Sequence, residues 1–305
     1  MVSFDTVQCK KRVSTQPSER LLCCLLSSSG ACVIWIQRIL FSLNSHTISH
    51  PLAALTMSTP HKPKRTVGVS LKMYFSLERT TQYIHSITPL GPAARSHSVD
   101  IFVIPDFTSL VTTSTAIRLS APTIRLGAQD CFWEDEGAYT GEISPAVLKQ
   151  IGCSLVELGH AERRRLFGET DEVVARKAKA VVRNGMTPLV CVGERNRGSV
   201  EDAVDECRSQ IESVLEVTGE EEIIFAYEPV WAIGQKEPAS AEYVVAVTKE
   251  LRKLCRERSV RFLYGGSAGP GTFEKMKEGV DGLFLGRFGH EPENFAKVIE
   301  EIGIP

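Results

Sequence analysis

The chain has 305 residues, a formal net charge of −2 at pH 7 and 43% hydrophobic residues. This length fits either one large domain or two small ones, and the apolar content is enough for a packed core. The nearly balanced charge gives no electrostatic basis for binding nucleic acid or an anionic membrane surface.

The N-terminal segment 1–56 differs from the rest of the chain. Its apolar run from Leu21, "LLCCLLSSSGACVIWI", is interrupted by serines and is shorter than the roughly 20 residues that a membrane helix needs. Further apolar residues follow where a secretory signal would be cleaved. We therefore expect a disordered extension, an organelle-targeting segment or a misassigned start, because Met57 precedes every motif described below. The domain is expected over 57–305, in the cytoplasm unless the extension directs it to an organelle.

From residue 66 onward, short apolar runs alternate with longer amphipathic stretches. The runs are too continuously apolar to leave one face to water, which is typical of strands in a parallel sheet covered by helices. Eight runs are expected to be strands: 66–72, 99–104, 123–128, 154–159, 187–192, 222–227, 261–266 and 281–286.

Amphipathic helices are predicted between these strands. Residues 171–185 begin with acidic residues, end on Asn-Gly and place apolar residues at helical spacing, and 199–217 and 240–259 follow the same pattern. Strand–helix units repeated eight times over about 250 residues predict a (β/α)8 barrel with eight parallel strands. A doubly wound open sheet is the alternative, but the Gly-x-Gly-x-x-Gly sequence typical of that fold is absent after the first strand.

Polar residues and glycines gather where the strands are expected to end. In a (β/α)8 barrel the active site lies at the carboxyl ends of the strands. The residues found there are Lys72, Gln129, His160, Glu194, Glu228, Ser267 and Gly286.

Glu228 and His160 suit proton transfer beside a carbonyl group. A carboxylate can remove a C–H proton while an imidazole donates a hydrogen bond to the oxygen that becomes an enediolate. Lys72 would add positive charge next to that oxygen. A lone histidine is more often structural, but a histidine accompanied by a lysine and a glutamate at strand ends favours catalysis.

Glycine-rich turns after the last two strands, 264–269 and 285–289, predict a phosphate site. Backbone N–H groups in such turns can approach a phosphate closely. Gly234 would add another N–H group from the loop 229–240, which has a proline near each end. We expect this loop to be a lid that excludes water; an ordinary connecting loop is the alternative, although such loops are typically shorter.

The sequence resembles the triosephosphate isomerase family over 66–290, nearly the whole chain after Met57. The most specific matches are "LGHAERR" and "AYEPVWAIG". The matching stretches occur in the family's order and are 70–73, 127–131, 137–145, 158–169, 191–194, 226–234, 264–267 and 281–286.

This resemblance implies catalytic roles for the matching residues. Glu228 is then the base that moves a proton between two carbons, and Lys72 is the cation near the substrate oxygen. His160 is the neutral electrophile; a histidine kept neutral at a helix N-terminus is a known feature of this family. Glu162 is a supporting carboxylate behind these groups.

The resemblance also implies the binding residues and the assembly. Gly234, Ser267 and Gly286 would hold the phosphate of a small sugar phosphate. Family members are homodimers in which a loop of one subunit completes the neighbour's site, and here Thr140 lies at the tip of the matching loop. No cofactor and no metal ion is implied.

Three positions depart from the family pattern. Ser70 replaces an asparagine, and a hydroxyl makes fewer hydrogen bonds than an amide. Ala161 replaces a serine that holds the base when the site is open, so its loss should be mild. Arg287 replaces a glycine beside the phosphate-binding N–H groups, where it would either clash with phosphate or bind it bidentately.

These features give a primary functional expectation and two alternatives. The primary expectation is interconversion of D-glyceraldehyde 3-phosphate and dihydroxyacetone phosphate through an enediolate, as in glycolysis and gluconeogenesis. Ser70 and Arg287 resemble the branch that isomerises four-carbon erythrulose phosphates, which is the first alternative. A non-catalytic relative that only binds a sugar phosphate is the second.

Overall fold

The computed structural model describes residues 65–234 and 239–303. The extension predicted at 1–56 and part of the predicted lid, 235–238, lie outside the described residues. Within the described part, no helix has the length and apolar character that crossing a membrane requires.

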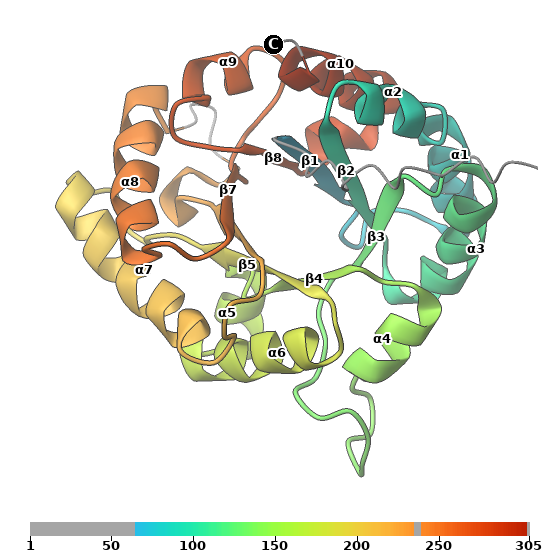
Figure 1. The fold of residues 1–305 in the computed structure, drawn as a ribbon, viewed down its shortest axis with the longest axis horizontal. Helices are drawn as coiled ribbons and strands as arrows, with labels where there is room; N and C mark the ends of the chain where they lie inside the picture. The colour runs from blue at the N-terminus through green and yellow to red at the C-terminus, as the bar shows by residue number, and fades with distance from the viewer. Residues whose placement is uncertain (1–64, 235–238, 304–305) are drawn as a thin grey trace, which may run out of the picture. The chain divides into compact units, whose positions relative to one another are not determined.

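Parallel strands form a closed barrel in which each strand pairs with its neighbours in sequence and β1 pairs with β8, as predicted (Figure 1). The strands are β1 (Arg65–Ser70), β2 (Val99–Ile104), β3 (Ile124–Ala128), β4 (Leu155–Leu158), β5 (Thr187–Val192), β6 (Ile223–Tyr227), β7 (Val260–Tyr264) and β8 (Gly282–Leu285).

Helices surround the barrel and connect its strands (Figure 1). They are α1 (Leu77–Ile87), α2 (Leu90–Ser96), α3 (Leu110–Ser120), α4 (Pro145–Ile151), α5 (Ala161–Phe167), α6 (Asp171–Arg183), α7 (Val200–Leu215), α8 (Ala241–Leu254), α9 (Thr272–Met276) and α10 (Pro292–Gly303). Short 3-10 turns lie at Phe107–Ser109, Val230–Ala232 and Arg287–His290.

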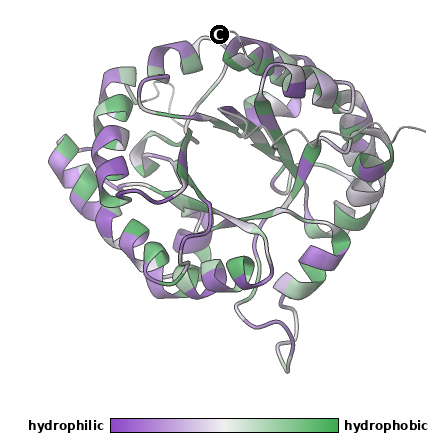
Figure 2. Cartoon of the chain, viewed as in Figure 1, coloured by the Kyte–Doolittle hydropathy of each residue, from purple (hydrophilic) through white to green (hydrophobic). Residues whose placement is uncertain are grey.

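Helix α6 illustrates why these segments become helices. The Thr170 side chain accepts a hydrogen bond from the backbone N–H of Val173, and acidic residues occupy the first turn, where the helix dipole favours negative charge. Val174, Ala178 and Val181 are fully buried on one face. The outer helices accordingly carry both hydrophilic and hydrophobic residues along their lengths, whereas the strands are mainly hydrophobic (Figure 2).

Several predicted elements end one to five residues earlier in the structure than in the sequence-based assignment, and the first strand and helix α8 are examples. The first strand ends at Ser70 and not at residue 72, because Lys72 has a positive φ of 48° that leaves the extended region. Helix α8 ends at Leu254 and not at residue 259, and Arg256 just beyond it has φ 49°. Both residues lie in turns between elements.

Alternate strand residues fill the inside of the barrel. The middle of the barrel is apolar, and a Cβ at Gly68 would overlap the ring of Phe102, so only glycine leaves room for that ring. At the amino-terminal end, Arg261 donates to the Thr66 hydroxyl and pairs with Asp100. Side chains therefore fill the middle and the amino-terminal end of the barrel, and a site can form only at its carboxyl-terminal end.

Five cysteines in the described residues are buried and free, and they pack as small apolar side chains: Cys131, Cys153, Cys191, Cys207 and Cys255.

Candidate active site

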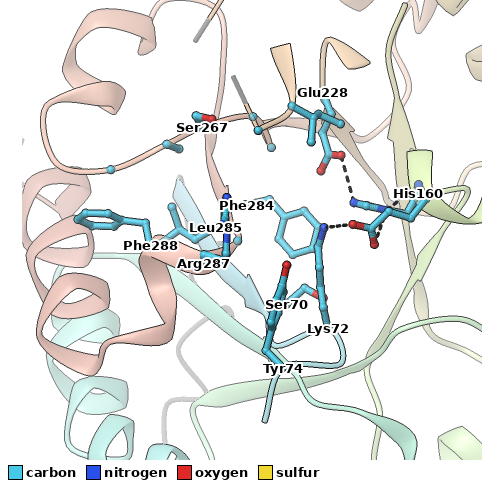
Figure 3. Close-up of a pocket in the computed structure, with 18 residues that line it drawn as sticks. Ser70, Lys72, Tyr74, His160, Glu228, Ser267, Phe284, Leu285, Arg287 and Phe288 are labelled. Atoms are coloured by element: carbon cyan, nitrogen blue, oxygen red, sulfur yellow. Dashed lines mark hydrogen bonds and ion pairs between the residues drawn. The ribbon is translucent and has the colours of Figure 1, made fainter. Parts of the chain in front are cut away.

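A cavity of about 450 Å³ lies at the carboxyl-terminal end of the barrel (Figure 3). It brings together every predicted site residue except Thr140: Ser70, Lys72, His160, Glu162, Glu228, Gly234, Ser267, Gly286 and Arg287. In the part of the chain that the structure describes, no group of three His, Cys, Asp or Glu side chains could hold a metal ion.

Glu228 and His160 lie next to each other at one side of this cavity, with their side chains pointing toward one another (Figure 3). The Nε2 of His160 lies 3.4 Å from the Oε2 of Glu228, and the two residues are only 6% and 4% exposed. Gly265 leaves room for the Glu228 side chain, because a Cβ at residue 265 would overlap the Glu228 carboxylate. The carboxylate and the imidazole therefore reach the same enclosed space.

The surroundings of His160 determine which of its nitrogens carries the proton. His160 immediately precedes α5, and its Nδ1 accepts a hydrogen bond from the backbone N–H of Glu162 at 3.1 Å. The neutral ring therefore carries its proton on Nε2, directed into the cavity. Burial, reinforced by the charge of Lys72, lowers the pKa of His160 to about 4. The imidazole is a neutral hydrogen-bond donor at physiological pH.

The pKa of Glu228 is shifted in the opposite direction, upward. Burial, followed by repulsion from Glu157, raises the pKa of Glu228 to about 8, while the charge of Lys72 opposes this rise. A carboxyl group with such a pKa exchanges protons readily near neutral pH, which suits a general base.

Lys72 is fixed at the cavity by one contact of its ammonium group and one of its backbone oxygen. Its ammonium group lies 2.9 Å from the Oε1 of Glu162, and its backbone oxygen accepts a hydrogen bond from the Gln129 side chain at 2.8 Å. Burial acts to lower the pKa of Lys72, but the hydrogen bond and charge of Glu162 and the nearby carboxylates outweigh it, and the pKa is raised. Lys72 therefore stays positively charged where an oxyanion would develop.

The opposite side of the cavity offers backbone donors. Among the described residues, none accepts a hydrogen bond from the backbone N–H groups of Gly234, Ser267 and Gly286. Arg287 is exposed beside them and forms no ion pair with any described residue. This side can bind a phosphate without breaking an existing interaction.

Two other residues that the sequence singled out, Glu194 and Thr140, lie outside the cavity. Glu194 is 1% exposed and does not line the cavity. It accepts hydrogen bonds from the side chains of Tyr227, Trp231 and Tyr243, at 2.7 Å for Trp231. Glu194 thus anchors the start of the 229–234 segment. Thr140 is exposed on the connection between β3 and α4, which projects away from the ring of helices (Figure 1).

Sequence reasoning missed three residues that shape the cavity or its floor. Tyr74 and Gly265 line the cavity, and Glu157 lies buried beneath it, bonded to Ser70. Glu157 had a detectable signal, because it is a charged residue inside an apolar strand run. Tyr74 had no such signal, since an aromatic residue after a strand can lie in the core, on the surface or in a site.

Comparisons with known proteins agree with this geometry. A family model described as triosephosphate isomerase matches residues 65–302. An L-erythrulose-1-phosphate isomerase from Pectobacterium atrosepticum is 45% identical, with 78% of this chain and 95% of the relative covered. One from Rhizobium etli is 41% identical, with 77% and 91% covered. A triosephosphate isomerase from Dictyoglomus thermophilum is 36% identical, with 78% and 99% covered.

These relatives bear on both functional expectations from the sequence. They support an isomerase, and they favour the four-carbon alternative over the primary triose expectation, because both erythrulose-phosphate isomerases share more identity with the chain than the triosephosphate isomerase does. With its closed eight-stranded barrel and a match over nearly all described residues, the chain is an isomerase that belongs to the triosephosphate isomerase family.

Proposed function

We propose that the chain isomerises L-erythrulose 1-phosphate, a four-carbon ketose phosphate, by proton transfer through an enediolate. The convergence of Glu228 and His160 on one cavity, 3.4 Å apart, carries the proposal for the reaction. The substrate is supported by the relatives of that name and by Ser70 and Arg287, two of the three departures from the triose pattern.

The substrate's structure indicates where the chemistry occurs. L-Erythrulose 1-phosphate has its ketone at C2, a hydroxyl at C3 and a terminal hydroxymethyl group at C4. The carbon on the other side of the ketone, C1, bears the phosphate ester. Proton transfer between C3 and C2 moves the ketone to C3 and leaves the phosphate in place, so the product is again a ketose phosphate.

Each residue then has a defined task. The Glu228 carboxylate removes the proton from C3, and the N–H of His160 Nε2 donates a hydrogen bond to the C2 oxygen as negative charge develops on it. The Lys72 ammonium stabilises the same charge. His160 then passes its Nε2 proton to the C2 oxygen, which becomes a hydroxyl, and takes up the C3 hydroxyl proton in its place. Glu228 returns the carbon-bound proton to C2, so that the ketone forms at C3.

Phosphate binding positions the reacting carbons. The N–H groups of Gly234, Ser267 and Gly286 would hold the phosphate, and Arg287 would add a charged contact that glycine lacks. Fixing the phosphate at one side of the cavity places the substrate's reacting carbons beside Glu228 and His160, which supplies orientation that free reactants lack.

Isomerisation of triose phosphate is the second candidate, supported by the triosephosphate isomerase that is 36% identical. The full chain should be assayed with L-erythrulose 1-phosphate and with dihydroxyacetone phosphate in D2O, following deuterium incorporation by NMR. We expect kcat/KM to be at least about 10-fold higher for the four-carbon compound, which corresponds to about 1.4 kcal/mol. The reverse ratio would favour the triose reaction, and activity on neither would favour a binding protein.

A further inference from the structure

A hydrogen bond crosses the inside of the barrel beneath the cavity. Ser70, at the end of β1, donates from its hydroxyl to the Oε2 of Glu157 on β4 at 3.0 Å. The strands β1 and β4 are not neighbours in the barrel, so this bond spans its interior. Ser70 is 2% exposed and Glu157 is 3% exposed, so the pair is built into the floor of the site.

A buried carboxyl group at this position is costly to the fold unless it has partners. Burial raises the pKa of Glu157 to about 7, while the charge of Lys72 and the hydrogen bond from Ser70 oppose the rise. The other charged groups that act on it are the carboxylates Glu162 and Asp130. The proton transfer described above does not use Glu157, which does not line the cavity. The charge of Glu157 acts on the base Glu228, and its hydrogen bond connects it to Ser70, a residue that does line the cavity.

The direction of the hydrogen bond determines what Ser70 offers to a ligand. A serine hydroxyl has a single proton and two lone pairs. Because the proton is directed to Glu157, the lone pairs remain for the cavity, which Ser70 lines. Ser70 is thereby made an acceptor, which suits a substrate hydroxyl and disfavours a carbonyl oxygen or an oxyanion.

Ser70 lies where the extra group of a four-carbon substrate would project. In Figure 3, Ser70 lies beside Lys72 and Tyr74, on the side of the cavity away from Ser267. Ser70 also neighbours Gly286, because Val69 pairs with Leu285, but its hydroxyl is directed inward to Glu157 on β4. The end of a four-carbon chain remote from the phosphate would reach the cavity floor where this hydroxyl lies. A four-carbon ketose phosphate differs from a triose phosphate by one hydroxymethyl group at this end.

We propose that Ser70 and Glu157 form a specificity subsite in which Ser70 accepts a hydrogen bond from the terminal hydroxyl of a four-carbon sugar phosphate. Glu157 is a positioning residue that orients the Ser70 hydroxyl and has no contact with the substrate. This inference rests on the proposed four-carbon function and adds to it the residues that distinguish the longer substrate from the shorter one.

The test compares the ratio of kcat/KM for L-erythrulose 1-phosphate to that for dihydroxyacetone phosphate among variants of the full chain. Glu157→Val should lower this ratio about 10-fold, since a serine without its acceptor turns its proton toward the cavity. Ser70→Ala should lower the ratio similarly, and adding Glu157→Val to Ser70→Ala should have no further effect on it. Glu157→Gln keeps an acceptor oxygen of the same shape and should largely preserve the ratio.

Glu194→Gln is the control for altering a buried carboxyl group, because Glu194 is 1% exposed, bonds Tyr227 and Trp231 and does not line the cavity. It should leave the substrate ratio unchanged. If Glu157→Val lowers kcat/KM for both substrates by the same factor, or if its effect persists fully in the Ser70→Ala background, the subsite proposal is overturned.

A binding measurement separates this proposal from the proposed function. Erythritol 4-phosphate and glycerol 3-phosphate are unreactive and differ by one CH(OH) group, so their inhibition constants report the subsite without turnover. Glu157→Val should weaken only the first inhibitor, by about 10-fold. Absence of four-carbon turnover in the unaltered chain would overturn the proposed function alone, whereas equal weakening of both inhibitors would overturn the subsite. Should Glu157→Val fail to fold, Ser70→Ala gives the same comparison.

Discussion

The Nε2 of His160 and the Oε2 of Glu228 lie 3.4 Å apart, although one residue follows β4 and the other follows β6. Their surroundings shift the two pKa values in opposite directions, lowering that of His160 and raising that of Glu228. Burial holds the imidazole neutral and makes the carboxyl group more basic, so that one is a hydrogen-bond donor and the other a proton acceptor. This difference is what an enediolate reaction requires.

Shortening the base should reduce turnover without unfolding the chain. Glu228→Asp withdraws the carboxylate by one methylene, and a misplacement of about 1 Å costs about 100-fold or more in rate. We expect kcat to fall by at least that factor while the circular dichroism spectrum and the melting temperature are retained. Glu220→Asp, the same change at an exposed residue, is the control. Turnover close to that of the unaltered chain would remove Glu228 from the mechanism.

Activity should depend on the protonation of Glu228. The base acts only when it is ionised, and its pKa is raised to about 8 in the free protein. We therefore expect kcat/KM to increase with pH and to reach half its maximum near pH 8, since kcat/KM reports groups of the free enzyme. His160, with its pKa lowered to about 4, is already neutral throughout this range.

Glu157 offers an internal check on that pH profile. Its negative charge is the second cause of the raised pKa of Glu228, after burial. Glu157→Gln removes the charge and keeps the shape, so the midpoint of the kcat/KM profile should move to lower pH. A midpoint near 4.5, the ordinary value of a glutamate, would show that burial does not control the base.

Arg287 should contribute to substrate choice. Arg287→Gly restores the residue of the triose pattern and removes a charged side chain from the cavity, so we expect the kcat/KM ratio to shift toward dihydroxyacetone phosphate. Arg256→Gly is a suitable control, because Arg256 is exposed and its φ of 49° accommodates glycine. An identical ratio in Arg287→Gly and the unaltered chain would exclude the arginine from selection.

The projecting loop between β3 and α4 should be an assembly surface. Thr140 is exposed near its tip, and a bulky charge there would prevent insertion into a partner's site. We expect Thr140→Arg to convert a dimer to monomers in sedimentation measurements and to lower kcat. Thr81→Arg, on the exposed face of α1, should change neither property. A dimer of unchanged stability in Thr140→Arg would argue against this surface.

The repeated pattern along the chain was enough to predict the barrel. Each βα unit is specified by local hydrophobic periodicity, as in the run 187–192, which became β5 with the same bounds. Boundaries were less predictable where the backbone changes direction, as at Lys72, because a positive φ leaves no trace in the hydrophobic pattern. The substrate was also not decided by the motifs, since Glu228, His160 and Lys72 serve either chain length.

The sequence by itself determined that a lysine, a histidine and a glutamate gather at one end of the barrel, because parallel strands in a closed barrel bring all their carboxyl ends together. Only the tertiary structure decided how these side chains meet. The bond from Ser70 to Glu157 and the approach of His160 to Glu228 depend on the register of strands far apart in the chain and on side-chain directions inside the barrel. Such contacts arise from three-dimensional packing, which the order of residues along one strand does not reveal.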